Sequence, residues 1–438
     1  MKLALLSTLY FSQGLPYGFF TKALPVWMRQ EGMPLQVIGY SSLLALPWGL
    51  KFLWAPVVDR FSGSSLGRRR GGILPLQAAT VATLGLLALV GTGGLGNGSA
   101  FVVALAVGMV VTNVMASTQD IATDGLAVDL LSGQERGLGN GVQVAAYRVG
   151  MIVGGGALLA ALTHWGWTAT FLLMAALVLL MSIPIARWTE PTTTTTTTKD
   201  AVSFAAVLHF VMKNKGGMLA WCAGLALFKI GDAFGSPMTS TLLIDKGYLV
   251  DDIAWLLGTL GSAAGMAGAM AGGLAAHRGR LRALVGCGLV HAVLMASYAL
   301  PVFFDLDKDL VGVLVVGEHF TGGMATVALF TAMMDACDAK AGATHYTTQA
   351  SVVVLASGLG SAVSGVSAAN LGYDLHFVIA GVVCAMGTLT MIPLYLLKWA
   401  PRDPSGDDPL QSTMLPAGSA SASPSSNVVT VTHTVERP

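Results

Sequence analysis

Three aspartates follow an apolar run in the stretch "MASTQDIATDGLAVDLL", residues 115–131, at positions Asp120, Asp124 and Asp129. Carboxylates four residues apart share one face of a helix, and oxygen ligands of this kind can hold Mg²⁺ for chemistry on a diphosphate. They can equally close the end of a membrane-spanning helix in a transporter, by pairing with Arg136 and the arginines of nearby loops. The elements around them must decide between these two uses.

A metal-dependent transferase of the first kind, such as a membrane prenyltransferase, needs a second acidic motif that faces the first. The partner that the sequence offers is Asp335 with Asp338, two carboxylates only. Mg²⁺ and a diphosphate generally require more oxygen ligands than that. The sequence therefore favours Asp120 and Asp124 as gate and loop contacts, with a Mg²⁺-dependent, Asp-rich membrane transferase as the alternative.

The composition indicates a chain whose main solvent is lipid. Of its 438 residues 54% are hydrophobic and only 11% are charged, and the mean hydropathy is +0.67, whereas a soluble domain carries roughly a quarter charged residues. Four scattered cysteines, no two within five residues, predict buried thiols and no metal or redox cofactor. No basic tract with interleaved aromatic residues indicates a nucleic-acid partner, and no phosphate-binding P-loop indicates an ATP-driven pump.

Apolar stretches long enough to cross a bilayer, about 20 residues each, predict an all-α membrane protein with twelve spans. They are 3–28, 36–57, 72–92, 99–119, 137–162, 167–186, 217–243, 253–275, 282–303, 310–334, 346–370 and 375–398. The predicted organisation is a six-helix bundle at 1–186, a linker at 187–216, a second six-helix bundle at 217–398 and a disordered tail at 399–438. Gln13, Gly14 and Pro16 predict a break near the middle of the first helix.

Lysines and arginines gather in the connections on one side of these spans, and the opposite side has only Arg29, Lys246 and Lys308. The positive-inside rule then places both termini and the linker in the cytoplasm. The two halves echo each other in their charged loops and glycine-rich helices, as expected of carriers built from related repeats.

The loop "APVVDRFSGSSLGRRRGG" resembles a signature of the major facilitator superfamily, with Asp59 and Arg60 before Gly67 and Arg68. An acid near a helix terminus and an arginine fork can latch two helices in one conformation and release them in another. The alternative, positive-inside charge alone, explains the arginines but not the Asp59–Arg60 pair. The predicted gating residues are Asp59, Arg60, Arg68, Asp120, Asp124 and Arg136.

Several further stretches, among them "YFSQGLPYGFF", "GLKFLWAPVVDRF", "ERGLGNGVQVAAYRVGM" and "FKIGDAFGSPMTSTLL", resemble the AmpG-type muropeptide permeases and the acetyl-CoA transporters, including vertebrate orphan members. The resemblance implies two pseudo-symmetric six-helix bundles around a cavity lined by the first, fourth, seventh and tenth helices. Bacterial muropeptide permeases often carry two more spans, a departure that counts against a muropeptide as the solute.

Ionisable residues inside spans are costly in hydrocarbon and mark functional sites or buried pairs. The predicted substrate-binding residues are Gln13, Lys22, Arg148, Lys229 and Asp232, and Glu318 is the predicted proton carrier. The charged residues have structural alternatives: Lys22 at the outer membrane interface, Arg148 paired with Asp120 or Asp124, Lys229 neutralised by Asp232, and Glu318 paired with a lysine. Lys51, also inside a span, is expected at the interface or in a structural pair rather than in contact with the substrate. His319 is predicted to face elsewhere on its helix.

The sequence thus predicts a monomeric, proton-coupled secondary transporter of a small organic anion such as acetyl-CoA or a related acyl or peptide solute. Lys22, Arg148 and Lys229 would line a cationic passage suited to that solute. A non-transporting membrane receptor that signals through its tail is a further alternative, beside the transferase.

Overall fold

The computed structural model describes residues 2–30, 46–61, 67–90, 99–190, 212, 217–304, 306–337 and 341–397, and helices make up nearly all their regular structure. Met1–Ser405 form one compact unit. The predicted tail at 399–438 and nearly all of the predicted linker at 187–216 lie outside the described residues, so both remain predictions.

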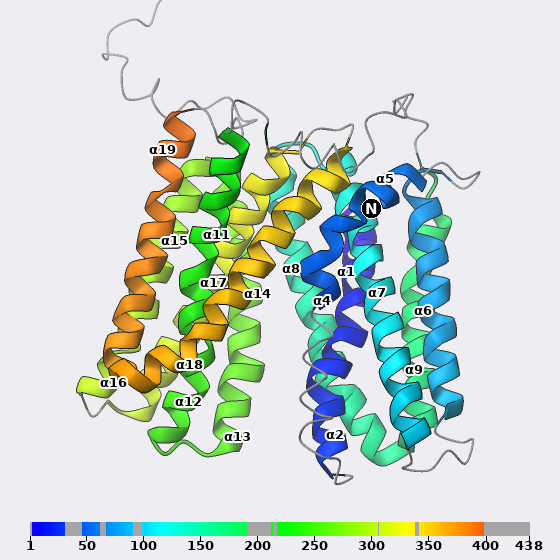
Figure 1. Ribbon diagram of the computed structural model, residues 1–438, viewed down its shortest axis with the longest axis horizontal. Coiled ribbons are helices and arrows are strands. Elements are labelled where there is room, and N and C mark those ends of the chain that lie inside the picture. Colours follow the sequence, from blue (N-terminus) through cyan, green and yellow to red (C-terminus); the bar gives the residue numbers. More distant parts are fainter. Residues whose placement is uncertain are drawn as a thin grey trace, which may run out of the picture. The chain divides into compact units, whose positions relative to one another are not determined.

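The helical segments of the first half run along the right of Figure 1. In chain order they are α1 (Lys2–Gly18), the π-helical turn η1 (Phe19–Ala23), α2 (Leu24–Gln30), α4 (Leu46–Leu50), η3 (Lys51–Leu53), α5 (Ala55–Phe61), α6 (Arg70–Val90), α7 (Ser99–Leu130), α8 (Arg136–Ile152), the π-helical turn η4 (Val153–Ala157) and α9 (Leu158–Arg187).

The second half repeats this style of construction. Its segments are α11 (Gly217–Gly235), α12 (Pro237–Asp245), α13 (Val250–Ile253), the π-helical turn η6 (Ala254–Leu260), α14 (Gly261–His277), α15 (Arg280–Ser297), α16 (Leu300–Phe303), α17 (Lys308–Asp335), α18 (Gly342–Leu389) and α19 (Met391–Leu396).

Within the described residues these segments make twelve helical passes, one for each predicted span, the second being described from Leu46 onward. Six continuous stretches are long and apolar enough to cross a membrane. Two of them hold two passes each, because α9 and α18 are interrupted at Gly166 and Gly372 with φ of 78° and 80°, a left-handed conformation that favours glycine. The interruptions fall at corresponding places in the two halves.

Two predicted boundaries are wrong. The fourth span does not end near residue 119, because α7 continues to Leu130 and carries Asp120 and Asp124 inside the helix. The first span is not broken near Pro16 either, since the chain stays helical and passes through the π-helical turn η1 one turn later. A π-helical turn accommodates one extra residue per turn without ending a helix.

Glycines in the first helix serve packing rather than a break. A Cβ at Gly14 would overlap the carbonyl of Tyr147 in α8, and a Cβ at Gly154 would overlap the carbonyl of Leu15 in α1. Small residues let helix backbones approach closely, which is the main route to stable helix contacts in lipid. The glycine-rich fifth span therefore packs directly on the first.

The same device joins α14 to α17 and joins the two halves. A Cβ at Gly268 would overlap the carbonyl of Phe320 in α17. Between the halves, Gly137 of α8 and Gly273 of α14 lie so close that a Cβ on either would overlap the carbonyl of the other. This contact lies at the end of the helices that also holds the loop arginines Arg68–Arg70 and Arg280, called the basic end below.

Large apolar side chains cover much of the outer surface, with Leu86, Val293 and Leu359 exposed by 64%, 65% and 66%. A soluble monomer rarely exposes such extended apolar surface. Facing lipid, these side chains are in their preferred solvent.

We expect Gly154→Ala to destabilise the protein by about 1–3 kcal/mol, the usual cost of overpacking, because the added methyl meets the backbone of Leu15. Gly156→Ala is the matched control, since a Cβ there meets nothing within 4 Å. Thermal unfolding of the detergent-solubilised protein measures both. Equal midpoints for the two variants would contradict the close packing of η4 on α1.

Candidate functional site

Five ionisable side chains of the second half meet among the helices and are called the Glu318 cluster: Lys229 and Asp232 of α11, His291 of α15, and Glu318 and His319 of α17. Asp232 Oδ2 lies 2.5 Å from Lys229 Nζ, and its Oδ1 lies 3.3 Å from His291 Nε2. Glu318 Oε2 lies 2.8 Å from His319 Nδ1, and the Glu318 side chain is almost fully buried. The predicted pairing of Lys229 with Asp232 is confirmed.

Hydroxyl groups extend the cluster along α17. Lys229 Nζ donates to Thr326 Oγ1 at 3.1 Å, and His291 Nδ1 lies 3.3 Å from Thr321 Oγ1. Every polar atom taken from water into such a site must find a partner. The cluster therefore connects α11, α15 and α17 through side-chain bonds.

The expectation that His319 faces away from Glu318 is wrong. Although adjacent residues on a helix usually diverge, the His319 ring folds back so that its Nδ1 reaches both Glu318 and the carbonyl of Val315. Among the described residues, Glu318 forms its ion pair with His319 and not with a lysine. His291 was not singled out from the sequence, although an ionisable residue inside the span 282–303 is the same signal that identified Lys229.

Arg148 joins this cluster from the other half. It lies on α8, and its guanidinium fills the space beside Gly265 of α14, where any Cβ would overlap it. There it interacts electrostatically with Asp232 and Glu318. Arg148 is thus no partner of Asp120 or Asp124, and the alternative that placed it there is wrong.

The charges of the cluster balance. Two cations, Arg148 and Lys229, face two carboxylates, Asp232 and Glu318, so these side chains do not make the net positive lining expected from the sequence. Ligand atoms of Asp232, His291 and Glu318 lie within 4.8 Å of one another, a spacing that a metal ion could bridge. The adjacent ammonium and guanidinium groups oppose a further cation by direct repulsion.

A second buried charge group, the Lys51 triad, lies in the first half and consists of Lys51, Asp120 and Asp124. Lys51 Nζ pairs with Asp120 and lies 3.8 Å from Asp124 Oδ2, and the lysine is only 3% exposed. Tyr10 Oη donates to Asp124 Oδ1 at 2.8 Å, and Gln143 Nε2 donates to the same oxygen at 3.4 Å. The structural pairing favoured for Lys51 is confirmed.

The Lys51 triad shows whether Asp120 and Asp124 are available to hold Mg²⁺ or are already paired with a basic residue. The predicted contacts of Asp120 and Asp124 with Arg136 and the loop arginines are wrong. The longer α7 carries both aspartates inside the first half, where Lys51 is their partner. Their oxygens already hold an ammonium group, and the opposing Asp335 holds two arginines. Asp338 lies outside the described residues. A Mg²⁺–diphosphate site would have to break these pairs first.

Asp59 bonds to residues of both halves at the basic end, as the predicted latch requires, and its gating role stays a prediction. Its Oδ1 accepts from Arg69 at 3.0 Å and from Arg68 at 3.4 Å, and its Oδ2 accepts from the backbone N–H and the hydroxyl of Thr344 at 2.9 and 2.6 Å. Thr344 lies in the first turn of α18, where the helix dipole favours a carboxylate. Asp59 of the first half therefore caps a helix of the second.

A related contact crosses in the opposite direction. Asp335, at the end of α17, pairs with Arg280 of α15 at 2.6 Å and with Arg136 of α8 at 2.8 Å. Within the first half Arg69 pairs with Asp129 at 2.7 Å. Arg69–Asp129 and Arg280–Asp335 each join the start of a third helix to the end of a fourth, so the two halves carry the same ion pair.

Three predicted site residues remain. Gln13 is 1% exposed and donates to Thr123 Oγ1 at 3.1 Å, so it is engaged inside the first half. The Lys22 side chain is exposed, beside Gly155. The side chain of Arg60 lies outside the described residues. Substrate contact by Gln13 or Lys22 and gating by Arg60 stay predictions.

An aromatic cluster next to these charges was not found from the sequence. Tyr17, Trp48 and Tyr147 bring three rings together from α1, α4 and α8, with centroids 5.7 to 6.2 Å apart and each ring half-buried. Lys51 Nζ lies 5.6 Å from the Trp48 ring. Only packing of separate helices assembles it, so no local motif could have indicated it.

Comparison with known proteins identifies the family to which this chain belongs. A model of the Major Facilitator Superfamily matches residues 6–365. The chain belongs to this superfamily. The anhydromuropeptide permease of Escherichia coli (strain K12) is 34% identical over 348 residues, 78% of this chain and 69% of that protein.

Solved structures agree on the fold. The major facilitator transporter FucP in its outward conformation covers 90% of this chain and 98% of its own at a TM-score of 0.68 and 13% identity. The human organic anion transporter MFSD10 (TETRAN) covers 89% and 97% at a TM-score of 0.63 and 18% identity. The predicted fold of two six-helix bundles and the resemblance to AmpG-type permeases are confirmed.

Membership makes the chain an integral membrane transporter of a small solute, and its relatives are permeases rather than enzymes. The transferase alternative is therefore not retained. The cytoplasmic placement of both termini and the monomeric state stay predictions.

We expect Asp59→Asn to favour opening of the basic end, because removing one partner of a buried ion pair costs about 3–5 kcal/mol. The native reporter is Cys337, which is half-buried two residues after Asp335. Labelling of the Cys337 thiol by a maleimide should become about tenfold faster or more in the variant. A tenfold change corresponds to about 1.4 kcal/mol, which is less than the expected cost of breaking the pair.

Glu135→Gln is the control for this experiment. Glu135 pairs with Lys2 at 3.0 Å, but both side chains are nearly half exposed, and such pairs contribute little. A hydrogen bond from the Ser132 backbone N–H lowers the pKa of Glu135 to about 2, so the pair is charged at neutral pH. Unchanged Cys337 labelling in Asp59→Asn would show that Asp59 does not hold the basic end closed.

Proposed function

We propose that this transporter is a proton-coupled carrier of an organic anion that has an acyl or peptide body. The observation that carries the proposal is Arg148, which crosses from the first half into the Glu318 cluster of the second. A charge that bridges two moving halves links the occupancy of the site to their relative position. The name of the 34% identical permease, which handles anhydromuropeptides, supports a peptide-bearing solute, and acetyl-CoA is the other solute of the predicted class.

The solute and the cluster compete for the same cations. In this conformation Asp232 pairs with Lys229, and Arg148 interacts electrostatically with Asp232 and Glu318. Proton uptake by Glu318 would remove one negative charge and leave Arg148 free to bind an anionic group of the solute. The histidines beside Glu318 and Asp232 suit this exchange, because imidazole changes charge between about pH 5 and 8.

The aromatic cluster can bind the body of the solute. Tyr147 is the residue before Arg148 on α8, and Tyr17 and Trp48 pack against it. Aromatic rings supply apolar contact area together with polar atoms at their edges. A solute with one anionic group and one acyl, sugar or peptide portion would use both features, with Gln13 and Lys22 as the further predicted contacts.

The latch residues then control access. Asp59–Thr344 and Arg136–Asp335 join the two halves at the basic end, while Arg148 and Gly265 meet further along α8 and α14. Alternating access requires that the first set breaks when the other end closes. Binding at Arg148 and opening of the latches are thereby parts of one motion.

We expect Glu318→Gln to abolish proton-driven accumulation of solute while leaving solute exchange across the membrane intact, because the amide keeps the shape of the carboxyl but carries no titrating proton. Proteoliposomes with and without an imposed pH gradient, supplied with a muropeptide, acetyl-CoA or a monocarboxylate, measure both activities. Glu135→Gln is the control.

Two outcomes would contradict this assignment. If accumulation survives in Glu318→Gln, Glu318 is not the proton carrier. If Asp124→Asn abolishes accumulation and Glu318→Gln does not, the carrier belongs to the Lys51 triad, in which two carboxylates share one ammonium.

We expect Arg148→Gln to raise the KM for the anion about tenfold or more, the loss of roughly 1.4 kcal/mol of a charge-assisted contact. Arg278→Gln is the matched control, because Arg278 is exposed at the basic end. An unchanged KM in Arg148→Gln would remove Arg148 from the binding site. Absence of uptake for every solute, with wild-type protein properly folded, would show that the solute lies outside the proposed class.

A further inference from the structure

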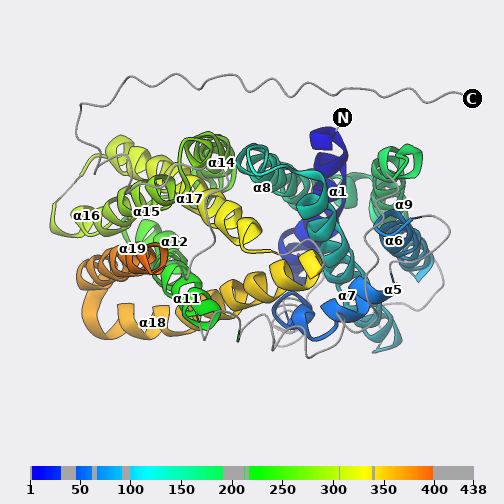
Figure 2. The ribbon, with the colours of Figure 1, turned by 90° about the horizontal axis from the view of Figure 1, so that it is seen from above.

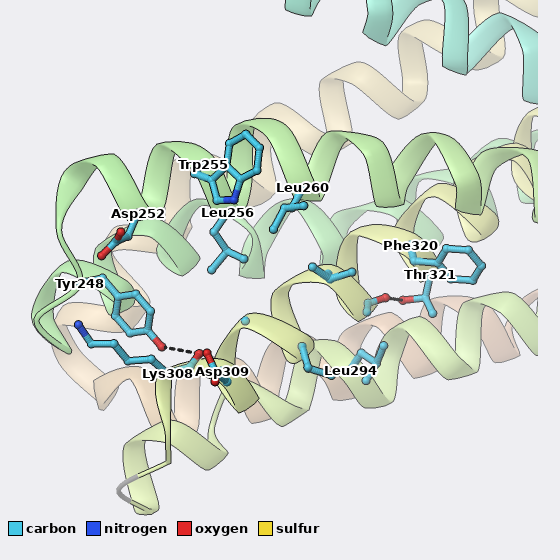
Figure 3. Close-up of a pocket in the computed structure, with 14 residues that line it drawn as sticks. Tyr248, Asp252, Trp255, Leu256, Leu260, Leu294, Lys308, Asp309, Phe320 and Thr321 are labelled. Carbon is cyan, nitrogen blue, oxygen red and sulfur yellow. Dashed lines mark hydrogen bonds between the residues drawn. The ribbon is translucent and has the colours of Figure 1, made fainter.

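A groove of about 840 Å³ lies on the second half, between α17 and the segment formed by α13 and η6 (Figure 3). Its floor is one face of α17 from Asp309 to Thr321, and Leu294 of α15 closes one side. The volume is within the range of small-molecule sites, about 300–1,000 Å³. The transport proposal above does not use it.

Two glycines keep this groove open. Along α17 the lining positions recur every three or four residues, which is one helix face, and Gly312 and Gly317 lie on that face. A Cβ at Gly312 would meet only Leu256, at 3.8 Å. The opposite wall is the seven-residue π-helical turn η6, and such turns are frequent at functional sites.

The groove has the dimensions and surroundings of one bilayer leaflet. The twelve helical steps from Asp309 to Thr321 span about 18 Å, close to half of a hydrocarbon core of roughly 30 Å. Trp255 and Val313 on its walls are 60% and 65% exposed, so the groove opens toward lipid. Tyr248 and Lys308 lie at its outer end, as aromatic and basic residues do at a membrane interface (Figure 3).

Charged groups occur only at this outer end of the groove. Lys308 Nζ lies 5.0 Å from the centre of the Tyr248 ring, and Tyr248 Oη donates to the Lys308 carbonyl at 3.2 Å. Asp252 and Asp309 are exposed beside them. A second groove of about 650 Å³, between α6 and α7, is lined by apolar residues and one threonine, with no charged residue. The first groove therefore combines an apolar channel with a specific polar mouth.

We propose that this groove binds one phospholipid with a primary ammonium headgroup, of the phosphatidylethanolamine type. Lys308 binds the phosphate, Asp252 and Asp309 accept hydrogen bonds from the ammonium group, and one acyl chain lies along Gly312, Gly317 and Phe320. An ammonium group offers three N–H donors, whereas a trimethylated choline offers none. One cation with two carboxylates also disfavours an anionic headgroup.

The inner end of the groove adjoins the Glu318 cluster. Thr321 lines the groove and donates to the carbonyl of Glu318 at 3.1 Å, and its hydroxyl lies 3.3 Å from His291 Nδ1. An acyl chain that reaches Thr321 restrains α17 and η6 where the cluster is built. The lipid therefore stabilises the conformation in which this groove is open.

The test measures thermal unfolding of the full-length protein in detergent with added phosphatidylethanolamine, phosphatidylcholine or phosphatidylglycerol of identical acyl chains. We expect phosphatidylethanolamine to raise the midpoint of thermal unfolding until the effect saturates. Phosphatidylcholine and phosphatidylglycerol should need about tenfold higher lipid concentrations or more for the same effect. Native mass spectrometry of the same samples should show one retained lipid.

Gly312→Leu fills the groove and should abolish the phosphatidylethanolamine effect, whereas Gly286→Leu, on the outer face of α15 where a Cβ meets nothing within 4 Å, should preserve it. Asp252→Asn leaves the channel open and should remove the preference among headgroups. Equal stabilisation by the three lipids, or an undiminished effect in Gly312→Leu, would overturn the proposal. Neither readout depends on transport, so both are independent of the solute assignment.

Discussion

Charge buried in hydrocarbon is the constraint on which the rest of this structure depends. An unpaired ion inside the membrane is costly, so each charged side chain that the sequence places within a span must find a partner or face water. Here Lys51 pairs with Asp120 and Asp124, and Asp335 pairs with two arginines, so both groups join different helices. Lys229 pairs with Asp232 on its own helix, α11.

The same pairs make the structure changeable. Asp59 and Asp335 each bond to residues of both halves at the basic end, and Arg148 interacts across the interface with Asp232 and Glu318. A buried ion pair adds little net stability compared with apolar packing, but breaking it is expensive unless a new partner replaces the old one. In the proposed transport cycle, a solute or a proton is that partner, and its binding moves the two halves.

Glycine contacts bring helix backbones close together at this interface. Gly137 and Gly273 bring α8 and α14 into backbone contact between the halves, and Gly268 does the same for α14 and α17 (Figures 1 and 2). The interface between the halves also contains buried apolar side chains, because one core cluster includes Leu6, Val128 and Leu131 of the first half and Met333, Met334 and Tyr346 of the second. It therefore combines backbone contacts, charged bridges and apolar packing.

Hydropathy by itself predicted a twelve-span membrane protein and singled out Lys229 and Glu318, because a charge inside a long apolar run is costly whatever its neighbours are. The resemblance of its loop to a superfamily signature singled out Asp59. The sequence could not assign Asp120 and Asp124 to Lys51 rather than Arg136, place Arg148 beside Gly265, or bring His319 back to Glu318. Those outcomes depend on how far α7 extends and on which helices meet, and such contacts join residues up to 285 positions apart, as for Asp59 and Thr344. Only the tertiary structure decides them, because the partner of a buried charge is set by the packing of whole helices and not by its neighbours in the chain.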